Sequence, residues 1–178
     1  VADADGSGDI SCIDKMLHSL EELLSRSTRD NITQSSLVQP PALVVGYRQS
    51  PESKSPLRAL LSWGFRACVR LIFLGSSNLG IRDTQCGFKL MTPSAGKVLY
   101  NRLNLRRWTH DVEVVHRARL LGYTVGECGV SWVDKDGSKL VTKSSDAVRV
   151  SLAMLSEILK MRVQYALGKW KVDPEKSG

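Results

Sequence analysis

Two aspartates near the beginning of the sequence have the spacing of a site for a divalent cation. Asp3 and Asp5 are separated by one residue and are followed by Gly6. In an extended backbone, side chains at positions i and i+2 point to the same side, so both carboxylates can reach one ion. Carboxylate oxygens suit Mg²⁺ or Mn²⁺, and such an ion also binds a diphosphate. The same residues also fit a surface turn or a calcium loop, although Asp14 stands where that loop needs a bidentate glutamate.

Four further motifs combine acidic, basic and aromatic residues. The densest is Arg82-Asp83-Thr84-Gln85-Cys86-Gly87-Phe88-Lys89-Leu90. The others are Val45-Gly46-Tyr47-Arg48, Trp108-Thr109-His110-Asp111-Val112-Glu113, and Trp132 with Gly137-Ser138-Lys139-Leu140. Together with Asp3-Ala4-Asp5-Gly6, this series closely resembles the dolichyl-phosphate β-glucosyltransferases, which are family 2 glycosyltransferases of the GT-A type. The resemblance covers nearly the whole chain, to about Trp170.

The resemblance implies an activity and its partners. It implies that glucose is transferred from UDP-glucose to dolichyl phosphate with inversion, and that dolichyl β-glucosyl phosphate forms for N-linked glycan precursor assembly. The partners would be the UDP-glucose donor, the dolichyl phosphate acceptor and a membrane surface, with no nucleic acid. The enzyme would work at the cytosolic face of the endoplasmic reticulum membrane. Two other functions stay open: a related polyprenyl-phosphate glycosyltransferase with another sugar or lipid, and a non-catalytic basic module that binds RNA or membranes.

The resemblance also assigns roles to single residues. Asp3 and Asp5 would hold Mg²⁺ or Mn²⁺ to neutralise the UDP leaving group. Asp83 and Asp111 would be catalytic and would orient the sugar or the acceptor, and Asp111 is the candidate if a base is used. The attacking phosphate oxygen is already largely anionic at pH 7, so positioning and charge neutralisation should dominate. The expected substrate-binding residues are Arg48, Arg82, Gln85, Lys89, Ser138 and Lys139.

Three of these residues have structural alternatives. Asp111 could cap the helix that it opens. Arg82 could pair with Asp83 or stay solvated. Lys89 could be a surface residue of a strand.

Some features depart from the family. Tyr47 stands where a small residue is expected and could crowd the donor pocket. From the resemblance we expect the family's N-terminal nucleotide-binding part and membrane anchor to be missing from this sequence. We therefore expect residues 1–170 to form a partial GT-A domain that is inactive alone. Residues 25–41 would be a loop insertion, and residues 171–178 a C-terminal tail.

Composition and charge agree with a globular enzyme that binds phosphates. The chain has 178 residues, of which 42% are hydrophobic, so it can form one domain and is not disordered. Twenty-five Lys and Arg against eighteen Asp and Glu give a net charge of +7, which suits a phosphate-bearing partner. The four cysteines include no C-x-x-C pair, which makes a zinc site improbable and indicates reduced thiols on the cytosolic side of a membrane.

Strands and helices alternate, which predicts an α/β fold. We expect it to be the C-terminal part of a GT-A fold, with a mixed sheet flanked by helices. The predicted strands are Ala42–Gly46, Cys86–Met91 and Val125–Val133. The predicted helices are residues 13–24 with Ser11 as N-cap, 57–75, 93–103, 111–121 with Gly122 as its stop, and 146–167.

Two of these helices have apolar faces that could rest on lipid. In residues 57–75, Arg58, Arg66 and Arg70 lie near one line beside the apolar face. Residues 146–167 carry two apolar stripes: Val148, Leu152, Leu155, Leu159, Val163 and Leu167 form one, and Val150, Met154, Ile158 and Met161 form the other. We expect an apolar surface rimmed by arginines near the active-site end. The alternative is burial of both helices in the core.

Overall fold

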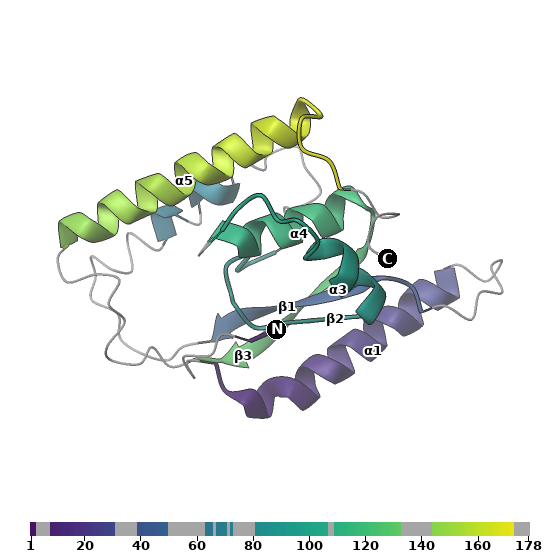
Figure 1. Ribbon diagram of the computed structural model, residues 1–178. Helices are drawn as coiled ribbons and strands as arrows, with labels where there is room; N and C mark the ends of the chain where they lie inside the picture. Colours follow the sequence, from purple (N-terminus) through teal and green to yellow (C-terminus); the bar gives the residue numbers. More distant parts are fainter. Residues whose placement is uncertain are drawn as a thin grey trace.

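The computed structural model describes residues 1–2, 8–30, 39–49, 63–65, 67–70, 72, 81–106, 109–132 and 144–172. In chain order the elements are η1 (Ile10–Cys12), α1 (Ile13–Asp30), β1 (Ala42–Gln49), β2 (Lys89–Met91), α3 (Pro93–Leu99), α4 (His110–Leu120), β3 (Thr124–Ser131) and α5 (Ser144–Ala166). The α/β class and the mixed sheet flanked by helices are therefore as predicted (Figure 1).

The three predicted strands form one sheet in the order β2-β1-β3. β1 is the central strand, and it pairs antiparallel with β2 and parallel with β3. Val44 lies opposite Leu90 of β2 and opposite Gly126 of β3, which fixes the register on both sides. β1 is longer than predicted and ends at Gln49, whereas β2 is shorter and begins at Lys89.

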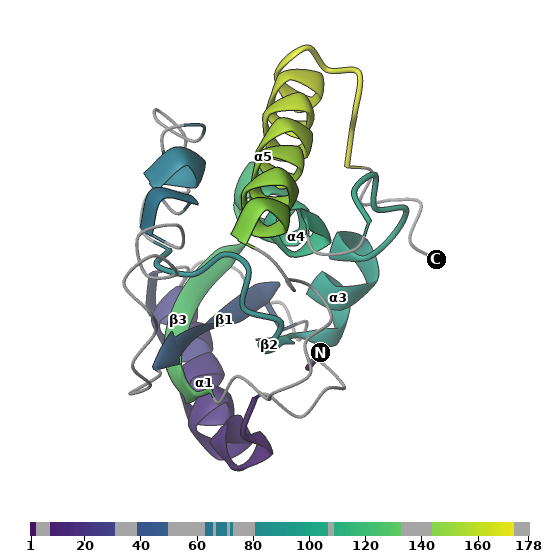
Figure 2. The same cartoon turned by 90° about the vertical axis from the view of Figure 1, so that its left-hand side faces the viewer.

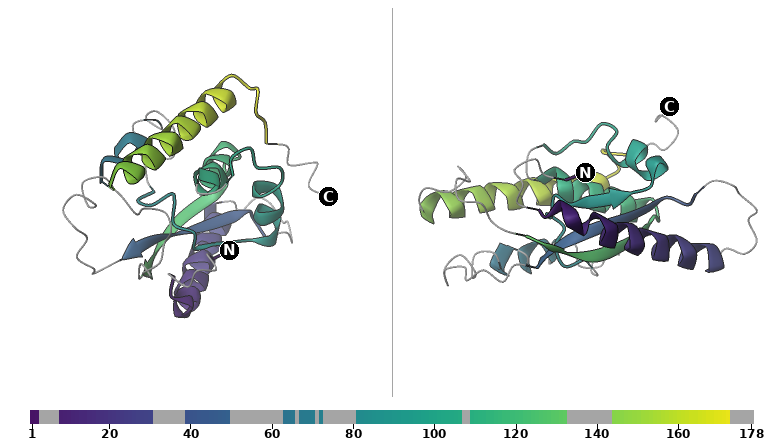
Figure 3. Two further views of the ribbon diagram at one scale, coloured as in Figure 1. Left: turned by 60° about the vertical axis from the view of Figure 1, so that its left-hand side comes forward. Right: turned by 90° about the horizontal axis from the view of Figure 1, so that it is seen from below.

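Alternation along β1 divides the core into two layers, because successive side chains of a strand point to opposite faces. Ala42 and Val44 face α1, where they pack with Met16 and Leu20. Leu43 and Val45 face the other side and pack with α3 and α4. The view from below in Figure 3 shows α1 lying across its face of the sheet.

Helix α4 lies between the sheet and α5. Every residue from Asp111 to Ala118 is buried, because both sides of this helix are covered. The outer side packs against α5 through Val112, Ile158 and Met161. Figure 2 shows α5 as the outermost layer, on the far side of α4 from the sheet. No helix of the described residues has the length and hydropathy needed to cross a bilayer.

The beginning and end of α1 differ from the prediction. The 3-10 helix η1 precedes α1 and contains Ser11, and its N-cap is Asp9, whose carboxylate accepts the Ser11 N–H at 2.9 Å. The helix continues to Asp30, so residues 25–30 do not belong to the predicted loop. The Ser25 hydroxyl donates to the Glu21 carbonyl at 2.9 Å, which lets a polar residue stay inside a helix. Residues 31–38 lie outside the described part of the chain.

The other helices agree with the prediction in place and differ in detail. α3 stops at Leu99, four residues before the predicted end. α4 ends as predicted, with Gly122 in the left-handed region at φ 69°. In α5 the stripe that contains Ile158 and Met161 is the buried one. The other stripe is largely exposed, at Val148, Leu152, Leu159, Val163 and Leu167.

The predicted helix at residues 57–75 is described only in part. Residues 63–65, 67–70 and 72 are helical. Phe65, Val69 and Ile72 pack in the same core cluster as α5, so the described part of this face contacts the core, while Trp63 is 64% exposed. Arg70 is exposed, while Arg58 and Arg66 lie outside the described residues.

Candidate active site

The segment from Ile81 to Phe88 carries the densest sequence motif and crosses close to β1. The Gly46 N–H donates to the Phe88 carbonyl at 2.8 Å. A Cβ atom at position 46 would lie 2.8 Å from that same oxygen and 3.1 Å from Sγ of Cys86. Glycine at this position therefore lets the segment lie directly against the central strand.

The first predicted pair of site residues is Arg48 with Asp83. Arg48 is the last residue but one of β1, and its Nε and Nη2 donate to the Asp83 carboxylate at 2.6 and 3.2 Å. Oδ1 of Asp83 also accepts the Gln85 backbone N–H at 3.3 Å. The Arg48 guanidinium lies 5.6 Å from the centre of the Trp132 ring. Asp83 is thus held as an oriented carboxylate by a bidentate partner.

The second pair is Lys89 with Asp111, and it is buried. Nζ of Lys89 lies 2.6 Å from Oδ1 of Asp111 and also donates to the Cys86 carbonyl. The Lys89 side chain is 0% exposed, so the alternative of a surface strand residue is wrong. The alternative for Asp111 is also wrong, because the N-cap of α4 is Thr109. Asp111 lies in the first turn of α4, where the helix dipole favours an anion.

Cys86 lies close to both pairs. Burial raises the pKa of its thiol to about 11, and the nearby Asp83 carboxylate also raises it. The thiol therefore stays protonated at neutral pH and is not a nucleophile. The two ion pairs share the segment from Asp83 to Lys89, so four of the predicted site residues come together around it.

Arg82 points away from these two pairs. Its Nε lies 3.6 Å from Oε2 of Glu127 on β3, and its backbone N–H donates to the same carboxylate. Its guanidinium lies 4.7 Å from the centre of the Tyr47 ring. The expected alternative partner, Asp83, is bound to Arg48 instead. Tyr47 thus provides a surface on which Arg82 stacks.

Four predicted site residues lie outside the described part of the chain: Asp3, Asp5, Ser138 and Lys139. The described residues on either side of the two aspartates are anchored near the ion pairs. The Val1 backbone exchanges hydrogen bonds of 2.8 and 2.9 Å with Lys89, and Gly8 forms a β-bridge with Trp132. Among the residues that the structure describes, no three His, Cys, Asp or Glu side chains form a cluster for a metal ion.

The sequence interpretation missed a buried network behind Asp111. The Glu113 carboxylate accepts hydrogen bonds from the Tyr165 hydroxyl at 2.7 Å and from the Leu105 N–H at 2.6 Å, and it pairs with Arg117 at 2.9 Å. Burial alone would raise the pKa of Glu113, but these donors together with Asn104 lower it. The i, i+4 spacing of Glu113 and Arg117 was the only sequence signal for this network.

The site arrangement suits the positioning of a polar substrate. Asp83 and Asp111 are two carboxylates fixed by separate cations on adjoining elements. Asp83 keeps 10% and Asp111 9% of its side chain exposed, so each is desolvated while part of it stays accessible. Carboxylates of this kind can accept hydrogen bonds from sugar hydroxyls or stabilise a positive charge that develops nearby.

Comparison with known proteins confirms the resemblance that the sequence indicated. The chain is 32% identical over 178 residues to the dolichyl-phosphate β-glucosyltransferase of Dictyostelium discoideum, and this match covers 97% of the chain. It is 33% identical over 176 residues to the Drosophila melanogaster protein of that name and 31% identical over 181 residues to the Homo sapiens protein. The matched region is 48%, 48% and 49% of these three proteins, so the chain spans about half the length of the curated relatives it matches. No family model and no solved structure matches the chain.

Proposed function

We propose, from the premise that this chain is a relative of the dolichyl-phosphate β-glucosyltransferases, that it belongs to an enzyme that transfers glucose to dolichyl phosphate. The observation that carries this proposal is the match over 97% of the chain to proteins of that name. The GT-A type of fold and UDP-glucose as donor are parts of the same proposal. A phosphate oxygen of the acceptor forms a bond to the anomeric carbon, and the bond from that carbon to UDP breaks. UDP leaves with the electron pair, and the product is the β-glucosyl phosphate.

Asp83 and Asp111 are the proposed catalytic residues. The acceptor phosphate is largely ionised at pH 7, so it needs little help from a base. The two carboxylates would instead orient the glucose hydroxyls and stabilise positive charge on the sugar in the transition state. Arg82, whose side chain is 66% exposed, is the most accessible described candidate for a phosphate contact. Arg48, Gln85, Lys89, Ser138 and Lys139 keep their predicted substrate-binding roles, and the buried position of Lys89 favours an indirect role through Asp111.

A divalent cation, Mg²⁺ or Mn²⁺, is part of the proposal. Asp3 and Asp5 would hold it, and when bound it would supply positive charge to the leaving diphosphate. Val1 and Gly8, on either side of these aspartates, contact Lys89 and Trp132 beside the two ion pairs, which supports a site there.

The acceptor is a lipid, so we also propose that the protein works at a membrane surface, at the cytosolic face of the endoplasmic reticulum. The exposed stripe of α5 supports this proposal, since Leu152 and Leu167 are each 62% exposed. From Val148 to Val172 the only acidic residue is Glu157. Five basic residues accompany it: Arg149, Lys160, Arg162, Lys169 and Lys171. An apolar stripe with a positive charge excess fits an interfacial helix on anionic lipid.

Glucose transfer in the full-length protein tests the proposal. The assay measures transfer from UDP-glucose to a short polyprenyl phosphate, with magnesium and then with a chelator. Removal of one anionic ligand in Asp5→Asn should lower the rate on the order of 10²-fold. Asp9→Asn is the matched control, because Asn caps a helix as well as Asp does, and it should keep the wild-type rate. Transfer from another nucleotide sugar but not from UDP-glucose would contradict the proposed donor, and full activity under chelation would contradict the metal.

Vesicle binding tests the membrane surface separately. Leu152→Ser with Leu159→Ser should weaken co-sedimentation with vesicles of phosphatidylcholine and phosphatidylserine, because both side chains lie on the exposed stripe. Leu120→Ser on α4 is the matched control, since Leu120 is 53% exposed but lies on another helix. An equal loss of vesicle binding in the control and in the Leu152→Ser, Leu159→Ser variant would refute the proposal that the exposed stripe of α5 contacts the membrane.

A further inference from the structure

The first turn of α4 carries Asp111 and is held from two sides. On the sheet side, Lys89 of β2 binds Asp111 directly. On the opposite side, three residues of the same turn contact α5: Thr109, Val112 and Glu113. The position of Asp111 therefore depends on α5 as well as on the sheet.

Thr109 makes the first of these contacts in an unusual way. It is the N-cap of α4, yet its side chain forms no capping hydrogen bond to its own helix. An N-cap hydroxyl ordinarily accepts an N–H from the first turn. Here the buried Thr109 hydroxyl has two acceptors outside its own helix, Oε2 of Glu157 at 2.7 Å and the Arg106 carbonyl at 3.1 Å. The shorter contact ties the helix terminus to α5.

Tyr165 makes the second contact. Its hydroxyl donates to Oε1 of Glu113 at 2.7 Å, and it also accepts from Nε of Arg117 at 2.8 Å. Burial and the Glu113 carboxylate raise the pKa of Tyr165 to about 12, so the phenol stays neutral and remains a donor. Glu113 is the second residue after Asp111 in the same turn.

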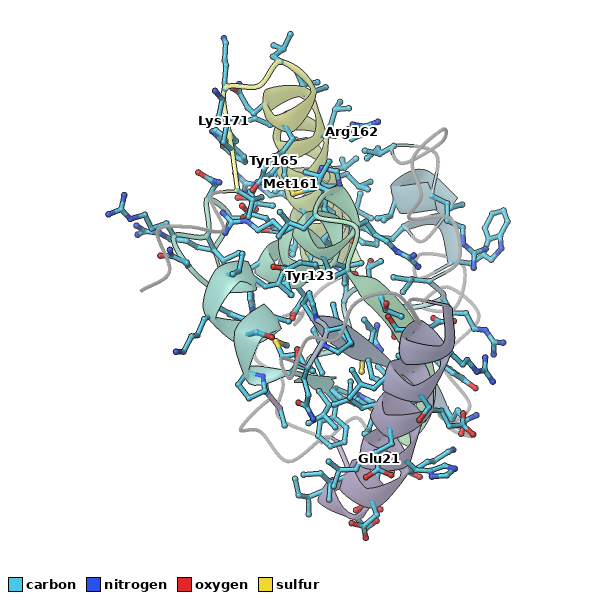
Figure 4. The ribbon with its side chains drawn as sticks, turned by 90° about the vertical axis from the view of Figure 1, so that its right-hand side faces the viewer. Glu21, Tyr123, Met161, Arg162, Tyr165 and Lys171 are labelled. Atoms are coloured by element: carbon cyan, nitrogen blue, oxygen red, sulfur yellow. The ribbon has the colours of Figure 1, made fainter. Side chains whose placement is uncertain are left out.

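One face of α5 makes all these contacts. Glu157, Met161 and Tyr165 are spaced four residues apart, so they line one side of the helix. Ile158 and Met161 pack with Val112 of α4 between the two hydrogen bonds. Figure 4 shows Met161 and Tyr165 on the side of α5 that is turned toward α4.

We propose that Glu157 and Tyr165 are positioning residues for Asp111, and that α5 sets the place of this carboxylate through Thr109 and Glu113. This inference rests on the proposed function, because it takes Asp111 as a catalytic residue. A displacement of about 1 Å at a reacting centre can cost about 10²-fold in rate. Hydrogen bonds that hold the turn carrying Asp111 can therefore control turnover.

Isosteric variants of the full-length enzyme test the inference. Thr109→Val removes the hydroxyl and keeps the shape, and Tyr165→Phe removes the phenol oxygen. Each should lower kcat on the order of tenfold, while KM for UDP-glucose changes less than about twofold, because the donor contacts are retained. Thr109→Ser retains the donor and Glu157→Gln retains an acceptor for the hydrogen bond between residues 109 and 157, so both variants should keep kcat near the wild-type value. Ser156→Ala is the matched control: its hydroxyl donates to the Ala153 carbonyl within α5, and it should behave as wild type.

Amide hydrogen exchange supplies a second measurement that does not depend on activity. Thr109→Val and Tyr165→Phe should raise exchange in the first turn of α4, and Ser156→Ala should not. The inference is overturned if Thr109→Val and Tyr165→Phe keep kcat within about twofold of wild type, even if they melt at a lower temperature. If the wild-type protein transfers no glucose, the proposed function fails. If Asp111→Asn slows transfer on the order of 10²-fold while Thr109→Val and Tyr165→Phe keep kcat within about twofold of wild type, only the positioning role fails.

Discussion

Replacing Lys89 with methionine removes the cation that faces Asp111 and keeps most of the side-chain volume. The two charged atoms lie 2.6 Å apart, and the Lys89 side chain is fully buried. At an effective dielectric constant of about 20, their attraction is about 6 kcal/mol, and the cost of desolvating both ions offsets a large part of it. Removing Lys89 leaves Asp111 with His110 as its neighbour, at 3.6 Å and charged only if protonated. Breaking a buried pair in this way costs about 3–5 kcal/mol. We therefore expect Lys89→Met to lower the free energy of unfolding by about that amount.

Urea denaturation at 15 °C measures this loss, because the free energy of unfolding of globular proteins is near its maximum at about that temperature. A double variant, Lys89→Met with Asp111→Leu, removes both charges and should recover most of the stability while transfer activity stays lost. Arg82→Met is the control, because the Arg82 side chain is 66% exposed and its 3.6 Å ion pair with Glu127 should be worth less than about 1 kcal/mol. The claim of a buried Lys89–Asp111 ion pair would be refuted by either of two results. One is a fall in the free energy of unfolding of less than about 1 kcal/mol for Lys89→Met, and the other is a double variant that is less stable than Lys89→Met.

Two further predictions concern stability. Burial lowers the pKa of His116 from 6.5 to about 4, so the unfolded chain binds a proton at pH 5 and the folded chain does not. Between pH 7 and pH 5 the free energy of unfolding of the wild type should therefore fall by about 2 kcal/mol more than that of His116→Gln. An equal fall for both proteins in urea titrations would contradict a buried, neutral His116 imidazole. Gly46→Ala should lower the melting temperature, at a cost of about 1–3 kcal/mol, because its Cβ would meet the Phe88 carbonyl at 2.8 Å. Gly96→Ala, in α3, should raise the melting temperature, because a Cβ atom at position 96 would make only ordinary contacts with Met91. A change in the same direction for both variants would contradict the close approach of Gly46 to the Phe88 carbonyl.

Strong local patterns predicted most of the elements. The apolar run from Ala42 indicated a buried strand, and it is the central strand of the sheet. Gly122 marked the end of α4 because a left-handed residue is needed there. The alternation of Cys128, Val130 and Trp132 indicated one buried face, and all three pack against α1. The motifs also brought together Arg48, Asp83, Lys89 and Asp111 without any information on their pairing.

The remaining features depend on tertiary contacts that the sequence does not show. α5 carries two apolar stripes, and only the position of α4 decides that the stripe with Ile158 is buried. Residues 25–30 have a polar composition typical of loops, yet they continue α1, where the Ser25 hydroxyl donates to the Glu21 carbonyl. Lys89 is buried because Asp111 and the Cys86 carbonyl meet its ammonium group, and neither contact is local enough to follow from a strand pattern. The link from Thr109 to Glu157 joins residues 48 positions apart.

The central claim is that this chain carries carboxylates of a glucosyltransferase. The most direct measurement compares the full-length wild-type protein with Asp111→Asn in the transfer of labelled glucose from UDP-glucose to a polyprenyl phosphate. We expect the wild type to form a β-linked glucosyl phosphate lipid. Asp111→Asn keeps the side-chain size, and at a temperature where its circular dichroism spectrum matches that of the wild type it should form this lipid on the order of 10²-fold more slowly. Absence of the glucosyl lipid with the wild type, or equal rates for both proteins, would contradict the claim.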